Sequence, residues 1–373
     1  MNLTDLPVEI SQLILTHADF LTQIRFRCVN KLFYQKLEVN DFFNIGRRYT
    51  DRLSDSILQA YPFITKLNVD DNQKVTNIDH LARLEVLSAV YRSNIDDDAL
   101  KNHNLKKLNT NFNLKITNVN HMSRLETLYA KGKYCCIGND GISSLNLKKL
   151  KACYNHKIYK IEHMSNLKIL HTKRNSNIDD YTIANLNLIK LKANENPFIT
   201  NVNHMTNLET LYATYNCGID DNGISNLNLK KLRTDHNPKI TNLNHMSNLK
   251  ILYADSHYAH DNCGIDNMSI QNLNLKKLSI WYNSKITNLN HMTNLEILIA
   301  GGNKCGIGDQ GISNLNLVKL IASDNPNITD VNHMTKLEVL HASNNCGIDF
   351  NGIAKLKLKE LISWNNPKIL NPS

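Results

Sequence analysis

Apolar residues recur along most of the chain at a nearly constant spacing. The frame apolar-x-x-Leu, as at Leu229–Leu232, repeats from residue 64 to the end of the sequence. Successive frames start 20–22 residues apart, except for one step of 26. A period of this length, kept over fifteen coils, predicts a solenoid of stacked repeats. The frames start at residues 64, 84, 105, 125, 147, 167, 188, 208, 229, 249, 275, 295, 317, 337 and 358.

Each frame predicts one short strand, because side chains on a strand point alternately to the core and to solvent. One coil cannot bury its apolar face alone, so neighbouring coils stack and their strands form a parallel sheet. An Asn often follows eight residues after the frame start, where its amide can satisfy buried backbone groups of a turn. These residues are Asn113, Asn155, Asn175, Asn196, Asn216, Asn237, Asn283, Asn303, Asn325, Asn345 and Asn366.

Two types of coil alternate. One contains the segment Asn237–Met246, and the other contains Cys217–Leu227, in which an Asp can cap a short outer helix. These patterns resemble leucine-rich repeat proteins, and the second type is similar to their cysteine-containing repeats. The resemblance covers residues 64–373. It implies an α/β solenoid with a curved parallel sheet on the concave face and short helices or 3-10 turns on the convex face.

The first 63 residues do not follow this frame. Residues 1–38 predict three short helices, with Pro7 in the first turn of one and Asp19 as the N-cap of the next. Residues 39–63 predict a helical bridge, or N-terminal cap, to the repeats. Three such helices form a very small core, which usually needs a partner or a neighbouring domain.

Residues 1–38 resemble the F-box. The matching residues are Leu6, Pro7, Glu9, Ile10, Leu13, Ile14, Asp19, Phe20, Leu21, Val29, Asn30, Lys31 and Phe33, the last standing where many members carry Trp. The resemblance implies that six of the apolar residues contact a Skp-type adaptor, namely Leu6, Pro7, Ile10, Ile14, Leu21 and Val29. The alternative is a helical cap that only covers the first coil. An F-box ahead of leucine-rich repeats resembles proteins encoded by large DNA viruses and by protists, which implies a host–virus interaction if the source is viral.

Composition and charge narrow the function further. The 373 residues carry a net charge of +9, and residues 1–63 are neutral, so the whole surplus lies in the repeats. A basic surplus suits nucleic acid, an anionic membrane or an acidic protein, and it also follows from Lys-rich codon usage. The sequence has no apolar run of membrane-spanning length, no signal-peptide pattern and eight cysteines. We therefore expect an intracellular protein, cytoplasmic or nuclear, with reduced thiols.

Recurrent His-Met pairs and cysteines suggest metal or disulfide chemistry, but their spacing argues against both. Equivalent side chains two coils apart lie about 10 Å from each other, too far to share a metal ion or form a disulfide. We expect exposed histidines, buried methionines and helix-capping Asp-Asp runs. The sequence also carries no nucleophile–base or phosphate-binding motif, so we expect neither enzymatic activity nor a cofactor. The cysteines expected to be small buried side chains are Cys136, Cys217, Cys263, Cys305 and Cys346.

One coil is six residues longer than its neighbours, with its extra residues around 255–262. The insertion contains His257, His260 and Asp261, next to Cys263, but their spacing matches no metal-binding motif. A neutral loop and a loop that contacts a partner both stay open.

The concave face is the candidate binding surface. At its outer positions many lysines face glutamates of adjacent strands, and such pairs neutralise each other. Elsewhere basic and aromatic residues interleave, which favours an acidic or phosphorylated protein segment as partner. The predicted contact residues are Lys151, Lys173, Arg174, Lys192, Tyr212, Tyr215, Arg233, His236, Tyr253, Trp281 and Tyr282.

Together these features predict a non-enzymatic substrate receptor, monomeric outside its complex, that links a target to a Skp–cullin–F-box ubiquitin ligase. Two alternatives stay open: a leucine-rich repeat scaffold with no ligase link, and a protein that binds single-stranded nucleic acid through its basic and aromatic face.

Overall fold

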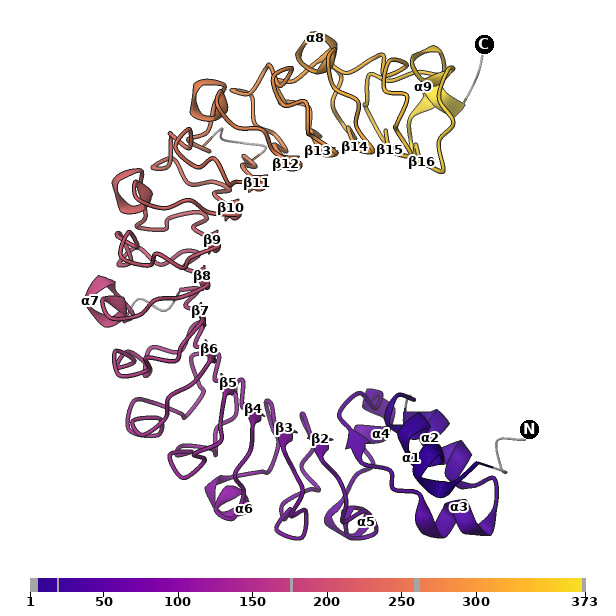
Figure 1. Cartoon of the computed structure of the whole chain (residues 1–373), viewed down its shortest axis with the longest axis vertical. Helices are drawn as coiled ribbons and strands as arrows, with labels where there is room; N and C mark the ends of the chain where they lie inside the picture. The colour runs from indigo at the N-terminus through magenta and orange to yellow at the C-terminus, as the bar shows by residue number, and fades with distance from the viewer. Residues whose placement is uncertain (1–5, 19, 175–176, 258–261, 371–373) are drawn as a thin grey trace. The chain divides into compact units, whose positions relative to one another are not determined.

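The computed structural model describes residues 6–18, 20–174, 177–257 and 262–370, which fall into two compact units, Met1–His171 and Thr172–Ser373. Within each unit the strands line one side, and the turns and short helices that connect them lie on the other (Figure 1). We call the exposed surface of the strands the strand face. It corresponds to the predicted concave face. No helix in the described part of the chain has the length and apolar character needed to cross a bilayer.

The first unit begins with helices α1 (Val8–Thr16), α2 (Phe20–Arg27) and α3 (Lys31–Lys36). Pro7 precedes α1, and the Asn30 side chain caps α3 by accepting the Phe33 N–H at 2.8 Å. Leu15, Phe33 and Leu37 form their small shared core. The predicted N-cap at Asp19 lies outside the described residues.

Residues 39–63 were expected to be a helical bridge, and this expectation is incomplete. The segment contains α4 (Arg47–Thr50) and α5 (Asp55–Gln59), but also the short strand β1 (Asp41–Phe42). Strand β1 pairs in parallel with the first predicted strand, and Phe42 lies in register with Leu67. The sheet therefore begins one strand earlier than the frame indicated, because buried Phe42 fills the position that Leu fills elsewhere.

The rest of the first unit is a parallel sheet whose strands follow the chain order. Every predicted frame in this unit forms a three-residue strand, and the frame leucines lie in register and fully buried. Helix α6 (Asp97–Leu100) lies between the second and third of these strands. The strands are β2 (Lys66–Asn68), β3 (Val86–Ser88), β4 (Lys107–Asn109), β5 (Thr127–Tyr129), β6 (Lys149–Lys151) and β7 (Ile169–His171).

The second unit repeats this design, again with parallel strands paired in chain order. Its strands are β8 (Lys190–Lys192), β9 (Thr210–Tyr212), β10 (Lys231–Arg233), β11 (Ile251–Tyr253), β12 (Lys277–Ser279), β13 (Ile297–Ile299), β14 (Lys319–Ile321), β15 (Val339–His341) and β16 (Glu360–Ile362). Its helices and 3-10 turns are α7 (Asp180–Ile183), η2 (Asn222–Ile224), η3 (Met268–Ile270), α8 (Asp309–Ile312), η4 (Asn351–Ile353) and α9 (Pro367–Leu370).

The two coil types fill the turn after the strand differently. In one type the frame Asn is buried, and the Nδ2 of Asn237 donates to the Ala213 and Ile219 carbonyls of the preceding coil at 2.9 and 3.2 Å. In the other type the frame Asn is exposed, as at Asn216, and the next residue, Cys217, is buried instead. The prediction of a capping Asn therefore holds for Asn113, Asn155, Asn196, Asn237, Asn283, Asn325 and Asn366, is wrong for the exposed Asn216, Asn303 and Asn345, and for Asn175 lies outside the described residues.

The cysteines that recur in alternate coils are free and buried, but the residue predicted for the first unit was the wrong one. The sequence favoured Cys136 in the first unit, but Cys135 is the buried residue, and its Sγ lies 3.5 Å from the Thr110 carbonyl oxygen. Cys136 is only half-buried. Cys135 lies two residues before Ile137, the same spacing as between Cys217 and Ile219, so Cys135 and not Cys136 has the position of the other buried cysteines.

The Asp-Asp runs and the His-Met pairs contact backbone groups of the coils, and the Asp contacts are those expected of capping residues. The Asp96 carboxylate accepts the Ala99 N–H, and the adjacent Asp97 accepts the Thr117 N–H of the next coil. The histidine of a His-Met pair is exposed, and His245 Nε2 lies 3.2 Å from the Ile224 carbonyl. Across the described ranges no group of three or more His, Cys, Asp or Glu residues is placed to hold a metal ion.

Candidate functional site

The N-terminal helices expose an apolar surface. Two polar side chains of these helices, Ser11 and Gln23, are buried, whereas the apolar Ile10, Ile14 and Leu21 are about 40% exposed. Of the predicted adaptor residues, Pro7 and Val29 are also exposed, and Leu6 is half-exposed. Exposed apolar side chains of this kind are typical of protein-binding surfaces. Sequence reasoning did not assign Leu13, Leu32 and Tyr34 to it, although all three are at least 50% exposed.

The strand face of the first unit carries a tyrosine surrounded by lysines. The Nζ atoms of Lys107, Lys149 and Lys151 lie 5.5, 5.4 and 3.8 Å from the centre of the Tyr129 ring. Partial burial raises the pKa of the Tyr129 phenol, but the hydrogen bond from Lys149 and the nearby ammonium charges outweigh it and lower the pKa overall. Burial, with the charges of neighbouring lysines, also lowers the pKa of Lys151. The lysines around Tyr129 therefore favour binding of a negatively charged group.

The second unit has two clusters of the same composition. Lys190, Lys192 and Lys231 lie 5.7, 4.5 and 5.6 Å from the centre of the Tyr212 ring. Burial raises the pKa of Tyr212, but the hydrogen bond from Lys231 and the surrounding charges lower it overall.

The adjacent cluster is centred on Tyr253. Lys231, Arg233 and Lys277 lie 5.2–5.3 Å from this ring. Arg233 also pairs with the buried Asp235, which reduces the positive charge it offers to a ligand. We call the surroundings of Tyr129, Tyr212 and Tyr253 the Tyr–Lys clusters.

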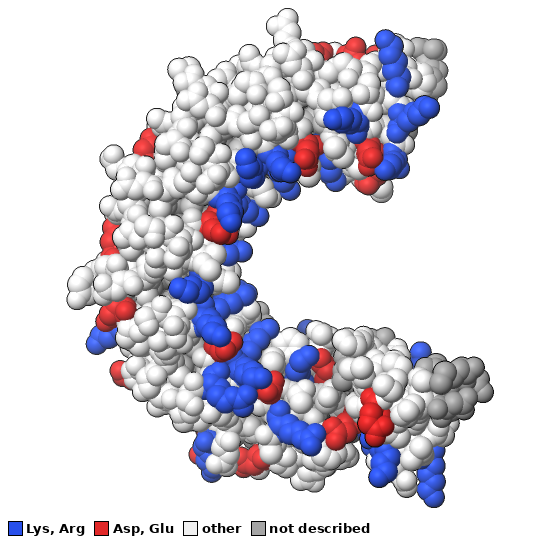
Figure 2. All heavy atoms as spheres, viewed as in Figure 1, with Lys and Arg blue, Asp and Glu red and all other residues white. Residues whose placement is uncertain are grey.

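Ion pairs with glutamates neutralise some of the lysines on the strand face. Lys148 pairs with Glu126, and Lys230 pairs with Glu209, both at 2.6 Å, so part of the strand face is neutralised as predicted. Within each unit the basic side chains gather along the strand side, with acidic ones interspersed (Figure 2). The lysines of β6 and β8 in the Tyr–Lys clusters lie at the first and third positions of their strands, next to a tyrosine.

Two predicted contact residues, Lys173 and Arg174, share an acidic partner that the sequence analysis did not consider. Both pair with Glu195 of the next coil, the Lys173 Nζ at 3.0 Å. Burial raises the pKa of Glu195, but these two cations lower it overall. Lys173 and Arg174 therefore offer less positive charge to a partner than their own side chains suggest.

Other predicted contact residues lie in the turns that follow the strands. The Tyr215 and His236 rings are 4.6 Å apart, and Trp281 and Tyr282 are 6.0 Å apart. Tyr215, His236 and Tyr282 all adopt a positive φ of 57°. They form an edge beside the strand face, whereas Lys151, Lys192, Tyr212, Arg233 and Tyr253 lie on the face itself.

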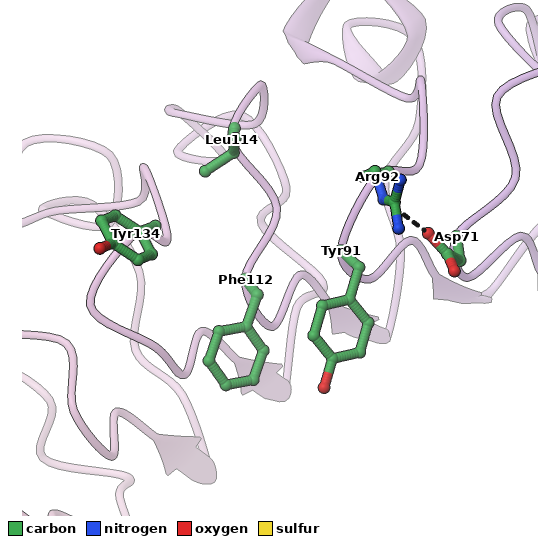
Figure 3. Close-up of a pocket in the computed structure, with 6 residues that line it drawn as sticks. All are labelled: Asp71, Tyr91, Arg92, Phe112, Leu114 and Tyr134. Atoms are coloured by element: carbon green, nitrogen blue, oxygen red, sulfur yellow. Dashed lines mark ion pairs between the residues drawn. The ribbon is translucent and has the colours of Figure 1, made fainter.

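The structure also contains an apolar groove that the sequence analysis missed. It has a volume of about 690 Å³ and lies at the carboxyl ends of β2 to β5 (Figure 3). The signal in the sequence was an aromatic residue seven positions after two successive frame starts, at Tyr91 and Phe112. The groove is lined by Asp71, Tyr91, Arg92, Phe112, Leu114 and Tyr134.

Comparison with known families matches residues 3–44 to the F-box domain. Together with the observed fold, this defines a chain with an N-terminal F-box domain followed by a parallel β-solenoid of the leucine-rich repeat type. The expected fold class is therefore confirmed. No curated protein matches the chain.

Several solved structures have a similar fold. The TLR13 chain of a TLR13–ssRNA13 complex is 18% identical, with a TM-score of 0.48 over 82% of this chain and 50% of that one. An internalin from Listeria monocytogenes is 20% identical, with a TM-score of 0.47 over 79% and 92%. A chain of the yeast Rad7–Elc1 complex is 16% identical, with a TM-score of 0.42 over 89% and 90%. The present chain thus spans about half the length of the TLR13 chain that it matches.

Proposed function

We propose that the protein is a substrate receptor of a Skp–cullin–F-box ubiquitin ligase. The observation that carries the proposal is the F-box domain with an exposed apolar surface at the positions expected to contact the adaptor. In this function the protein positions a target for ubiquitin transfer and performs no chemistry itself, as is typical of F-box proteins with leucine-rich repeats. The adaptor residues Leu6, Pro7, Ile10, Ile14, Leu21 and Val29 are part of this proposal, as are an intracellular location and a monomeric state outside the complex.

Burial of this surface would supply the binding energy. Each large aliphatic side chain that passes from full exposure to burial contributes roughly 1.5–3 kcal/mol. Ile10, Ile14, Leu21 and Val29 are already about half-buried. They therefore offer about half of that each, before the cost of association is subtracted.

The strand face would bind the target. Each Tyr–Lys cluster brings three cationic side chains to one tyrosine, and such a group attracts a carboxylate or a phosphate. The ring adds a rigid contact surface of the kind that is enriched in binding hot spots. An acidic or phosphorylated protein segment fits this combination of charge and aromatic surface.

A binding assay with the full-length protein and a purified eukaryotic Skp adaptor tests the ligase link. Ile10→Asp should weaken binding at least tenfold, because it places a charge in the apolar interface. Ile57→Asp is the matched control, since Ile57 is an exposed helical isoleucine outside the F-box, 41% exposed against 45% for Ile10. Equal binding by both variants, or no binding by the folded parent protein, would leave residues 1–63 as a structural cap.

A salt titration separates protein targets from nucleic acid. Binding of single-stranded RNA or DNA through released counterions weakens steeply with salt, in proportion to the phosphates contacted. Affinity for an oligonucleotide that exceeds the affinity for acidic peptides at physiological salt would favour the nucleic-acid alternative.

A further inference from the structure

The groove beside the strand face is built from exposed aromatic and aliphatic side chains. The Tyr91 and Phe112 rings stack with centres 5.1 Å apart and planes 3° apart. Tyr91, Leu114 and Tyr134 are each at least 55% exposed. Figure 3 shows these side chains projecting from the turns that follow successive strands. Exposed aromatic residues that converge on one concavity are characteristic of binding hot spots.

The backbone under the groove is held in a conformation that suits other residues better. Tyr91 and Phe112 have φ of 56° and 58°, a region that bulky residues rarely occupy and that Gly, Asn and Asp tolerate. At the same position of later coils the chain uses Gly302 and Asn344. The solenoid therefore does not require an aromatic residue at this position.

Gly132 completes the apolar wall. It occupies the same coil position as Phe112, with φ of 105°, and a Cβ there would lie 2.2 Å from the Phe112 ring. Glycine lets the ring lie flat over the next coil, so the stack reaches toward Tyr134.

The rim of the groove is cationic. Arg47 and Arg92 both approach the Asp71 carboxylate, at 2.8 and 3.4 Å, and both are 77% exposed. Lys133 lies over the Tyr134 ring, 5.7 Å from its centre. Asp70 lies beside Asp71, so two carboxylates face these three cations, and the rim keeps a positive balance around an apolar floor.

We propose that this groove is a second docking site for the target, and that it binds an acidic protein segment carrying a large apolar side chain. The apolar side chain would pack on the Tyr91–Phe112 stack, and acidic residues beside it would meet the cationic rim. The inference rests on the proposed function in calling the partner a target. The groove itself is separate from the F-box and from the Tyr–Lys clusters.

The test uses the full-length protein and three fluorescein-labelled nonapeptides. The first consists of Asp and Glu with one central Trp, the second has Ala in place of Trp, and the third has Asn and Gln in place of the acids. Fluorescence polarisation gives their affinities for the parent protein and for Tyr91→Asn and Phe112→Asn. Because Asn tolerates the positive φ, relief of strain offsets the lost stacking, and both variants should keep a Tm close to that of the parent.

The control is Tyr154→Asn. Tyr154 occupies the same coil position with φ of 61°, but it does not line the groove. The acidic Trp peptide should bind the parent and the Tyr154→Asn variant about tenfold more tightly than the Ala peptide does. This preference should disappear in Tyr91→Asn and in Phe112→Asn.

Other results would overturn the inference. Equal affinity for the Trp and Ala peptides would mean that only the Tyr–Lys clusters attract acidic segments. Equal affinity for the acidic and neutral Trp peptides would mean that the rim has no role. If a single-stranded oligonucleotide displaced the Trp peptide from the groove at a lower concentration than the peptide itself needs for binding, the occupant would be nucleic acid. The Ile10→Asp variant should retain peptide binding, which separates failure of the groove from failure of the adaptor interaction.

Discussion

Replacing Asn113 with alanine should destabilise the coils on both sides of it. Asn113 is fully buried, and its Nδ2 donates to the Ala89 carbonyl at 2.8 Å and to the Ile95 carbonyl at 3.4 Å. Its Oδ1 accepts the N–H groups of Lys115 and Ile116 at 2.7 and 3.0 Å. One side chain therefore satisfies backbone groups of two adjacent coils.

The magnitude follows from the groups left without a partner. Ala89, Ile95 and Ile116 are fully buried, so water does not readily replace the amide. At roughly 1–3 kcal/mol for each buried unsatisfied group, the three together cost about 3–9 kcal/mol. Asn216 provides the control, because it occupies the same frame position but is exposed, and Asn216→Ala should cost less than about 0.5 kcal/mol.

Hydrogen exchange measured by mass spectrometry is the suitable assay, because a repeat array can open locally without unfolding as a whole. In Asn113→Ala, protection should fall by at least about 100-fold in peptides covering residues 84–125, and far less in the second unit. If protection around residue 113 falls no further than it does around residue 216 in the control, the buried amide does not hold the coils together.

Two further predictions concern buried titratable groups. Burial, together with a neighbouring carboxyl, raises the pKa of Asp255, so the folded state is penalised once the pH exceeds the unfolded pKa. Asp255→Asn should therefore raise the free energy of unfolding at pH 7 and have little effect below about pH 4. Asn111 already occupies the equivalent coil position, and urea unfolding at both pH values would contradict the reasoning if the variant were less stable at pH 7. Burial raises the pKa of Cys217 to about 11 and that of Cys305 to about 12. A thiol reagent at pH 8 should therefore label the exposed Cys28 quickly, and should label Cys217 and Cys305 only after unfolding. Rapid labelling of Cys217 and Cys305 in a folded Cys28→Ser variant would refute this.

The repeat frame predicts the strands well because it reflects a requirement that is local to each coil. A frame Leu must be buried against the next coil, so its spacing alone locates every strand from β2 to β16. Strand β1 was missed because its frame runs from Val39 to Phe42, with Phe in place of Leu. Both residues are buried, and a frame that admits any large apolar residue would have found them.

The candidate binding surface was less predictable because it depends on neighbours one coil away. Lys173 and Arg174 look unpaired in sequence, because the predicted Lys–Glu pairs lie one residue after the frame start, whereas Glu195 lies seven residues after it. The groove depends on a turn conformation that places Tyr91 and Phe112 side by side. The frame locates the turn but does not give its φ. The adaptor residues and the strand-face contacts both stay predictions, as does the viral source.

The alternation of buried Asn and buried Cys has a consequence for how such a gene can change length. Asn155 donates to carbonyls of the Cys135 coil before it, and the Cys135 thiol in turn contacts the Asn113 coil before it, while the coils before Asn113 and Asn196 are of the same type but lack the cysteine. Loss of one coil by unequal recombination would join two coils of the same type and create a junction that occurs nowhere among the described residues. Loss or gain of two coils recreates only existing junctions. Recombination is therefore expected to preserve the array in steps of two coils, so that related genes would differ by even numbers of coils.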